Sequence, residues 1–245
     1  MRIGVYVDGF NLYYGARKHC GRSTPGWRWL DLRSLVEPLA GWGGSRIDRV
    51  VYCTARVDAA DNPSGHVDQA AYLDALLAHG SVDVIAEGRY VSWAKDEPLV
   101  NESSGAFRPT VYRHSDETWD ERLPLRLALG KRDESSRVMA TVQKREEKGS
   151  DVNVASHLLF DVLTARVDAA IVVTNDSDLE LPLRMARRRV PVGTVNPSTN
   201  PTAGALKGRS EDGVGGHWWR RLTAADYTSS QLPELVGKFR RPVGW

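Results

Sequence analysis

The sequence predicts an α/β fold in which helices cover a mostly parallel sheet. Apolar segments of strand length alternate with segments of helical periodicity over most of the 245 residues. Aspartates also follow two of the strand candidates directly, and in sheets of this kind ligands bind beyond the carboxyl ends of the strands. The sequence therefore predicts one layered domain with a site along a single sheet edge.

The first half of the chain contains three strand candidates and three helix candidates. A short apolar run opens the chain, and Gly9 permits a tight turn after it. Leucines at helical spacing and a stripe from Val67 to Leu77 mark two amphipathic segments. We predict strands over residues 2–7, 49–57 and 82–93, and helices over 11–18, 27–40 and 66–79.

The second half repeats this alternation after an irregular stretch. Residues 95–137 are polar and rich in turn formers, which predicts an insertion or a long loop. Beyond it we predict strands over 137–144, 169–174 and 190–195, and helices over 151–165, 179–189 and 223–231. The expected organisation is a domain over 1–198, followed by a loop and C-terminal segment over 199–245 that packs on or extends it.

Composition narrows the class of protein. The formal net charge is only +2, so overall charge points to no partner. Two cysteines without paired spacing indicate reduced thiols, and no apolar run is long enough to span a bilayer. The first residues enter a strand pattern directly, without the features of a signal peptide. We expect a cytoplasmic protein with no membrane association.

Four aspartates are expected to converge at one edge of the sheet. Asp8 ends the first strand, Asp176 and Asp178 follow a late one, and Asp151 opens a helix on its apolar side. Two carboxylates about 5 Å apart at an effective dielectric near 20 repel by roughly 3 kcal/mol, which a cation would relieve. Oxygen ligands without nearby His or Cys suit Mg²⁺ or Mn²⁺. Such a metal could activate a water to hydrolyse a phosphodiester.

Three of these acids also have a structural alternative, whereas Asp176 is harder to explain in that way because Ser177 already takes the capping role. Ser177 and Glu180 fit a capping box, in which Asp178 would only favour the helix dipole. Asp151 could be a first-turn acid, and Asp8 could cap the helix that follows it. Four independent caps at one edge are less expected than one shared site, so the site is the preferred interpretation.

Three segments carrying these acids resemble the motifs of NYN-domain proteins, a branch of the PIN-like ribonucleases. They are Val7-Asp8-Gly9-Phe10-Asn11-Leu12, Glu146 to Asn153 around Lys148-Gly149-Ser150-Asp151, and Val173 to Leu179 around Asn175-Asp176-Ser177-Asp178. Val192 to Pro197 gives a weaker match. The resemblance implies a PIN-like, Rossmannoid three-layer fold and a ribonuclease dependent on Mg²⁺ or Mn²⁺.

The resemblance also implies roles for single residues. Asp8, Asp151, Asp176 and Asp178 would hold the metal, with Asn11 orienting a metal-bound water or a phosphate. Lys148, Asn175 and Ser177 belong to the matching motifs and, with Asn11, are candidate substrate-binding residues. Arg56 joins them if its strand ends at the same edge.

The leading functional prediction is thus a metal-dependent ribonuclease, and the alternative is a non-catalytic RNA- or protein-binding regulator with the same fold. RNA is the expected partner. A protein partner or a second copy could bind through 95–137 or the C-terminal segment. Tyr13 and Tyr14 could stack a base, although one of them is expected in the core. The glycines at 213–216 lack dinucleotide-binding spacing, which argues against a nucleotide fold there.

Overall fold

The computed structural model describes residues 1–101, 110–111, 122–129 and 136–245. The chain forms two compact units, and each is described by itself. The first comprises Met1–Tyr90 and Glu147–Trp245, and the second comprises Val91–Glu146. Within the insertion predicted over 95–137, residues 102–109, 112–121 and 130–135 lie outside the described residues.

A sheet of eight strands organises the fold, in the order β10-β9-β8-β1-β2-β3-β7-β6. Neighbours from β10 through β3 all pair in parallel, whereas β6 and β7 pair antiparallel. The predicted three-layer α/β class is therefore confirmed. The strands are β1 (Arg2–Asp8), β2 (Arg46–Ala55), β3 (Val84–Pro98), β6 (Leu125–Leu129), β7 (Ser136–Lys148), β8 (Ala169–Val173), β9 (Val192–Asn196) and β10 (Trp218–Arg221).

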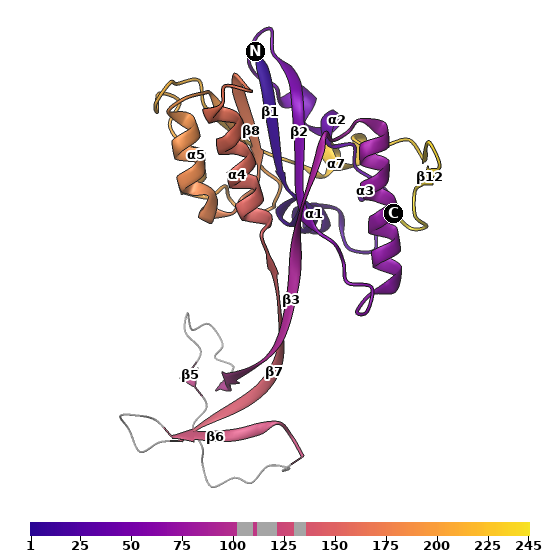
Figure 1. The fold of residues 1–245 in the computed structure, drawn as a ribbon, viewed down its shortest axis with the longest axis vertical. Helices are drawn as coiled ribbons and strands as arrows, with labels where there is room; N and C mark the ends of the chain where they lie inside the picture. The colour runs from indigo at the N-terminus through magenta and orange to yellow at the C-terminus, as the bar shows by residue number, and fades with distance from the viewer. Residues whose placement is uncertain (102–109, 112–121, 130–135) are drawn as a thin grey trace. The chain divides into compact units, whose positions relative to one another are not determined.

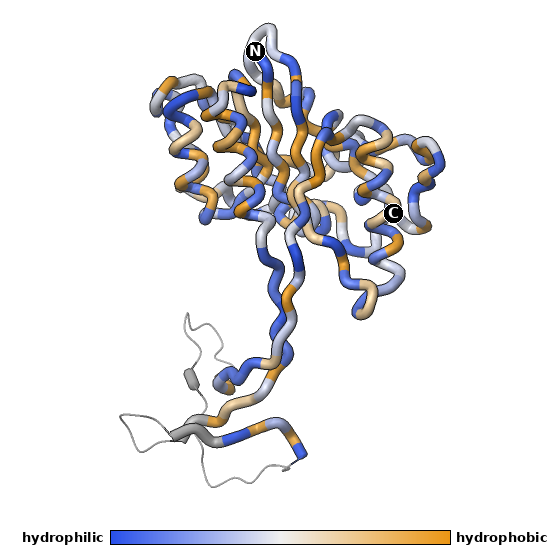
Figure 2. Tube along the Cα trace, in the orientation of Figure 1, coloured by the Kyte–Doolittle hydropathy of each residue, from blue (hydrophilic) through white to orange (hydrophobic). Residues whose placement is uncertain are grey.

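Helices cover both faces of the sheet in the first unit. In Figure 1, α4 and α5 lie on one side of β1 and β8, and α2 and α3 lie on the other. Hydrophobic and polar residues alternate along these helices in Figure 2, as expected when one face packs and the other is solvated. The helices are α1 (Gly9–Cys20), α2 (Leu32–Val36), α3 (Pro63–His79), α4 (Ser150–Leu163), α5 (Glu180–Arg187), α6 (Gly204–Lys207) and α7 (Ala224–Ser229), with short 3₁₀ turns η1 (Glu37–Leu39) and η2 (Ser177–Leu179).

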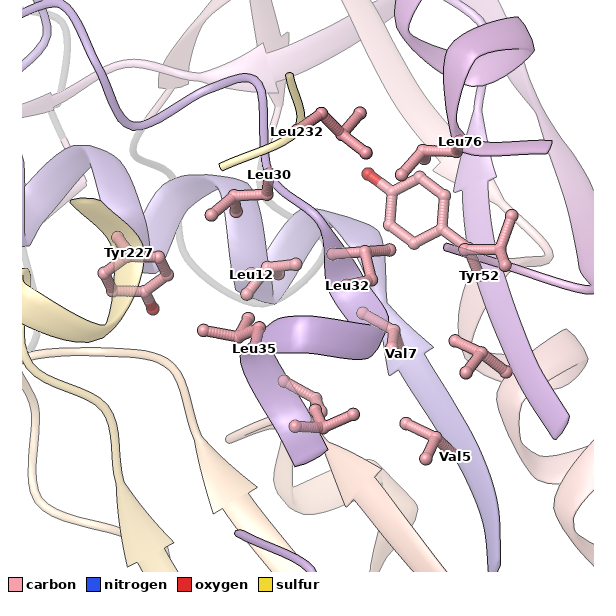
Figure 3. Close-up of a cluster of buried hydrophobic side chains, with 14 of the residues drawn as sticks. Val5, Val7, Leu12, Leu30, Leu32, Leu35, Tyr52, Leu76, Tyr227 and Leu232 are labelled. Atoms are coloured by element: carbon pink, nitrogen blue, oxygen red, sulfur yellow. The ribbon is translucent and has the colours of Figure 1, made fainter. Parts of the chain in front are cut away.

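Alternation along β1 divides the hydrophobic core into two clusters. Val5 and Val7 point toward α1, α2 and α3, whereas Tyr6 points toward α4 and α5. Figure 3 shows the first cluster, in which Val7, Leu12 and Leu35 gather with residues of the C-terminal segment. The sheet thus separates two packed layers, and the edge formed by the carboxyl ends of its strands borders both.

The C-terminal residues 199–245 belong to this core. Tyr227, Leu232 and Val236 are buried in the first cluster. Strand β10 extends the sheet, and β11 (Leu235–Val236) pairs with β12 (Phe239–Arg240). The strand β10 was not predicted, because its arginines and exposed Trp219 give no apolar alternation.

Helix boundaries differ from the predictions where tertiary contacts or capping decide them. The helix predicted over 27–40 begins only at Leu32, because Trp27 and Trp29 are buried in the preceding loop. Helix α3 starts at Pro63, three residues before its predicted start at residue 66. Asn62 caps it by accepting a hydrogen bond from the Gly65 amide at 3.0 Å.

The second unit consists of strand pairs. Residues of β4 (Val100–Asn101) pair antiparallel with β5 (Thr110–Val111), and β6 pairs with β7. Within it, Thr141 donates a hydrogen bond to Asp96 at 2.7 Å. Across the described residues of both units, no helix is long and apolar enough to cross a membrane.

Gly15 lets α1 pack directly on a backbone carbonyl. A Cβ there would collide with the Pro197 carbonyl group, because it would lie 2.7 Å from the carbonyl carbon. The oxygen of this carbonyl accepts a hydrogen bond from the Tyr227 hydroxyl at 2.5 Å. We therefore expect Gly15→Ala to destabilise the protein by about 1 kcal/mol, because overpacking of roughly 1–3 kcal/mol outweighs a helix-propensity gain of about 1 kcal/mol.

Urea denaturation of Gly15→Ala should show this loss. Gly204→Ala is the matched control, because a Cβ at this first residue of α6 meets nothing within 4 Å. If the two substitutions changed the free energy of unfolding equally, close packing of Gly15 would not be what requires glycine.

Candidate functional site

Asp8 lies buried at the carboxyl end of β1, with 1% of its surface exposed. Its carboxylate accepts hydrogen bonds from the Asn11 amide at 3.0 Å and the Asn11 side chain at 2.7 Å, and from the Thr174 hydroxyl at 2.9 Å. Burial raises the pKa of Asp8, and Asp176 adds to the rise. Asp8 therefore caps α1, the structural alternative considered for it, while remaining part of an acidic cluster.

Asp176 and Asp178 continue this network along the next strand. The Asp176 amide donates to the Thr174 hydroxyl at 3.1 Å, and the Asp176 carboxylate accepts from the Asp178 amide at 3.0 Å. Asp176 is thus the residue that caps η2. The capping box predicted at Ser177 is wrong, because the turn begins one residue earlier as a 3₁₀ helix.

Asp151 approaches the same edge from the first turn of α4. Gly149 adopts φ 110°, and the Glu147 carboxylate accepts from the Ser150 amide at 3.1 Å, so this turn is fixed. Partial burial together with the charges of Asp8, Asp176, Glu147 and Asp178 raises the pKa of Asp151 to about 6. The four predicted aspartates therefore share one electrostatic environment, and Glu147 and Thr174 join them.

The geometry of these acidic side chains bears on how they could hold a cation. Among the described residues, no group of three or more His, Cys, Asp or Glu side chains is arranged to hold a metal ion. Asp8 and Asp176 use carboxylate oxygens to cap helical turns, and Asp178 is exposed. Some of their oxygens are thus committed to the protein backbone.

The predicted substrate-binding residues have differing surroundings. Asn11 accepts from the Asn175 amide at 3.2 Å, and the Asn175 side chain accepts from the Ala203 amide at 2.9 Å. Ser177 and Lys148 are exposed near the acids along the chain. Arg56 follows β2, which ends at the same sheet edge as β1, and its guanidinium pairs with Glu87 at 2.8 Å.

A cavity of about 480 Å³ opens beside the same sheet edge, on the face of the sheet opposite α4. It lies between α1 and α3, and the buried Tyr52 and Tyr72 of the first core cluster line it. Tyr13 and Tyr14 are 42% and 53% exposed at its rim, so the prediction that one of them is in the core is wrong. The remaining aromatic lining residues are Phe10, Tyr90 and Trp245.

The charges that line this cavity are predominantly positive. Arg17, Arg22 and Arg28 contribute three cations, and Asp68 contributes one anion. Arg28 donates to the Gly244 carbonyl at 2.9 Å and lies 4.8 Å from the centre of the Trp27 ring. An aromatic wall beside guanidinium groups suits a planar anionic molecule.

Sequence reasoning missed this cavity, although one signal was present. Phe10, Tyr13, Tyr14 and Arg17 recur at helical spacing, which puts them on one face of α1. The contributions of Tyr52, Tyr72 and Trp245 come from distant parts of the chain, so only the fold assembles the site.

Two comparisons return a similar protein, and no protein-family model matches the chain. Among curated proteins, the 6-hydroxy-3-succinoylpyridine 3-monooxygenase of Pseudomonas putida is 28% identical over 261 aligned residues, covering 96% of this chain and 72% of the relative. Among solved structures, a protein of unknown function from Vibrio parahaemolyticus aligns with a TM-score of 0.38 and 15% identity, covering 84% of this chain and 86% of the other.

The similarity to a monooxygenase corrects the functional predictions. It points to an oxidoreductase, whereas the sequence predicted a ribonuclease, a hydrolase of RNA, with a non-catalytic regulator as the alternative. The predicted Mg²⁺ or Mn²⁺ cofactor is overturned with it, in keeping with the lack of a metal-holding group among the described residues. The resemblance to NYN-domain proteins and the RNA partner stay predictions.

A monooxygenase draws electrons from a redox cofactor, commonly a flavin or a nicotinamide dinucleotide. The turn from β1 to α1 does not fit the pyrophosphate of such a cofactor. Gly9 is its sole glycine, a Cβ there would lie 2.8 Å from the Cys53 carbonyl oxygen, and the Asp8 carboxylate occupies the helix N-terminus. The dinucleotide-binding turn instead needs several glycines and free amides that face the phosphates.

Proposed function

We propose that this chain is an oxidoreductase that binds a small aromatic compound in the cavity between α1 and α3 and inserts one atom of O₂ into it. The other oxygen atom leaves as water, with two electrons supplied by a reduced nicotinamide dinucleotide. The observation that carries the proposal is the cavity itself, with aromatic side chains from α1, β2, α3 and β3 around one opening. The reaction class comes from the similar monooxygenase, whose named substrate is a hydroxylated pyridine with a succinoyl group.

The size of the cavity supports this substrate class. Its volume of about 480 Å³ lies within the roughly 300–1,000 Å³ typical of small-molecule sites. Tyr72 donates to the Leu30 carbonyl at 3.0 Å, so its ring is held firmly in the wall. Phe10 and Tyr90 meet edge to face with their centres 6.0 Å apart. A planar ring can pack against such fixed aromatic surfaces at little entropic cost.

The protein's own residues would bind and orient the ring and exclude water from it. Tyr52 is buried, and burial raises the pKa of its hydroxyl to about 12, so the group stays protonated at neutral pH. It therefore presents a neutral wall to the ligand. No flavin or nicotinamide is placed at the β1–α1 turn, because this turn does not fit the pyrophosphate of such a cofactor.

An oxygen-uptake assay tests the proposal. The purified chain receives 6-hydroxy-3-succinoylpyridine or a hydroxylated aromatic acid, with NADH or NADPH as the reductant and with or without added flavin, and hydroxylated product is measured. We expect substrate-dependent oxygen consumption with product. Ser64→Trp, which places an indole at an exposed position of the cavity lining, should reduce turnover at least tenfold.

Ser156→Trp is the matched control, because Ser156 is exposed on α4, away from the cavity lining. It should behave like the parent protein. Absence of oxygenated product under every reductant would refute the proposed reaction, and equal activity of the two variants would place the chemistry outside this cavity.

A further inference from the structure

We infer that the cavity recognises its ligand by two ends: an anionic group bound by Arg17 and Arg22, and a hydrogen-bond donor, such as a ring hydroxyl or ring N–H, bound by Asp68. This inference rests on the proposed function and deepens it by naming the substrate class. The ligand would be an aromatic carboxylate that carries a polar donor at the far end of the ring.

The arginines of the cavity are not equivalent. Arg28 donates to the carbonyl oxygens of Gly244 and Arg22, so its guanidinium is used within the protein. The guanidinium groups of Arg17 and Arg22 line the same cavity but form no hydrogen bond or ion pair within the part of the chain that the structure describes. Arg17 is half-buried in the last turn of α1. Its guanidinium therefore loses part of its hydration without gaining a hydrogen-bond acceptor from the described protein.

A carboxylate is the group that best matches these two side chains. Guanidinium groups pair with carboxylates through parallel, charge-assisted hydrogen bonds, which are among the strongest in proteins. Since the overall net charge is only +2, this positive region is a local feature and not a consequence of composition. The aromatic side chains beside it, Tyr13 and Tyr14, suit the ring to which a carboxylate is attached.

Asp68 supplies a different recognition element from α3. It is half-buried and lines the cavity, and its carboxylate has no hydrogen-bond or ion-pair partner among the described residues. Its neighbour Gln69 fixes this wall: Gln69 accepts from the Val57 amide at 2.7 Å and donates to the Ala55 carbonyl at 3.0 Å. Asp68 is therefore presented on a braced helix, available to accept a hydrogen bond from a ligand.

The two ends do not neutralise each other within the protein. Arg17 belongs to α1 and Asp68 to α3, and the described structure contains no ion pair between them. Opposite charges on two walls of one cavity give a polarised site. A ligand lowers its free energy there by placing its anion toward α1 and its donor toward α3, which fixes the orientation of the ring.

Binding measurements with matched ligands test this inference without any turnover. The probes are 3-(4-hydroxyphenyl)propionate, its deoxy analogue 3-phenylpropionate, and the amide of the hydroxylated acid, titrated by calorimetry. We expect Arg17→Gln with Arg22→Gln to weaken binding of both carboxylates at least tenfold and to leave the amide nearly unchanged. Asp68→Asn should weaken the hydroxylated acid about tenfold and the deoxy acid less than twofold.

The first control is Arg188→Gln, because Arg188 is exposed at the end of α5, on the sheet face opposite the cavity. The second is Asp74→Asn, because Asp74 is an exposed aspartate of α3 that does not line the cavity. Both should bind all three probes like the parent, and all variants should keep the parent Tm within about 2 °C. The inference is overturned if each substitution weakens all ligands equally, or if none changes binding. Selective binding without oxygenation would refute the proposed reaction alone, whereas oxygenation without this selectivity would refute the inference alone.

Discussion

Replacing Asp161 with alanine is expected to reduce the free energy of unfolding by about 3–5 kcal/mol, the largest effect of any single substitution considered. Asp161 is fully buried on α4. Its carboxylate lies 3.0 Å from Arg49 Nε and accepts a hydrogen bond from the Tyr6 hydroxyl at 3.0 Å. Removal of the carboxylate would leave a largely buried guanidinium and a buried hydroxyl without their partner.

This cluster joins three elements of one face of the sheet. Tyr6 comes from β1, Arg49 from β2 and Asp161 from α4. Burial and the neighbouring carboxylate raise the pKa of Tyr6, so its hydroxyl remains a donor at all physiological pH values. Arg49 Nε lies near Asp161 without the alignment of a hydrogen bond, so the contact is chiefly a charge pair.

Urea denaturation of Asp161→Ala, Tyr6→Phe and the double variant measures this effect. Tyr6→Phe should cost only about 1 kcal/mol, because it removes one hydrogen bond and leaves the charge pair intact. Asp168→Ala is a surface control: Asp168 pairs with Arg2 at 2.8 Å, and both side chains are about 40% exposed, so we expect at most about 1 kcal/mol. A loss at Asp161 no greater than at Asp168 would contradict the structural role of the cluster.

The second large effect is a gain in stability when Asp151 becomes asparagine. Its pKa rises from 3.8 to about 6 in the folded protein, because burial and four neighbouring carboxylates disfavour its charge. At neutral pH the folded state therefore bears the cost of ionising this group. A shift of this size corresponds to roughly 3 kcal/mol, which solvent screening of a half-exposed group reduces to about 1–2 kcal/mol.

The sign of the pH dependence follows from this raised pKa. Below pH 3.8 the carboxyl is protonated in both states, and the repulsion is absent. As the pH rises toward about 6, the unfolded state ionises first, so the parent protein loses stability relative to Asp151→Asn. The variant should thus be more stable than the parent above about pH 6 and no more stable at pH 4.

Denaturation midpoints between pH 4 and pH 8, in buffer containing a chelator, provide the measurement. Asp226→Asn is unsuited as a control because Asp226 completes a capping box, whereas Asp74 is exposed on α3 and has no such role. Asp74→Asn should shift the midpoint little at any pH. A pH-independent difference between Asp151→Asn and the parent would show that repulsion within the acidic cluster does not destabilise the fold.

Much of the fold could be predicted from local patterns. Ala169–Val173 is a fully buried strand, as its continuous apolar character indicated, and the strand predicted over 190–195 is the buried β9 (Val192–Asn196). Helix α4 begins at Ser150, one residue from its predicted start. By contrast, β10 gives no local signal, because Trp218–Arg221 becomes a strand only by pairing with β9.

In the candidate sites, too, some features could be predicted from local patterns and others only from the tertiary structure. Asp8, Asp151 and Asp176 could be grouped in advance, because strand ends and helix starts meet at one edge of a parallel sheet. Which oxygens cap the backbone and which face solvent depends on turn geometry: η2 starts after Asp176 instead of after Ser177. The chemical interpretation, a metal-dependent ribonuclease, is overturned by the similarity to a monooxygenase and not by the geometry of these acids.

The sequence by itself determined the α/β class with helices covering a mostly parallel sheet, the order of most elements and the gathering of four aspartates at the carboxyl edge of that sheet. These features follow from hydrophobic periodicity and chain direction, which are local properties. Only the tertiary structure decided that Tyr52, Tyr72 and Trp245 meet Tyr13 and Arg17 around one cavity. That assembly depends on which helices pack side by side on a sheet face, and this is set by long-range packing that no local pattern encodes.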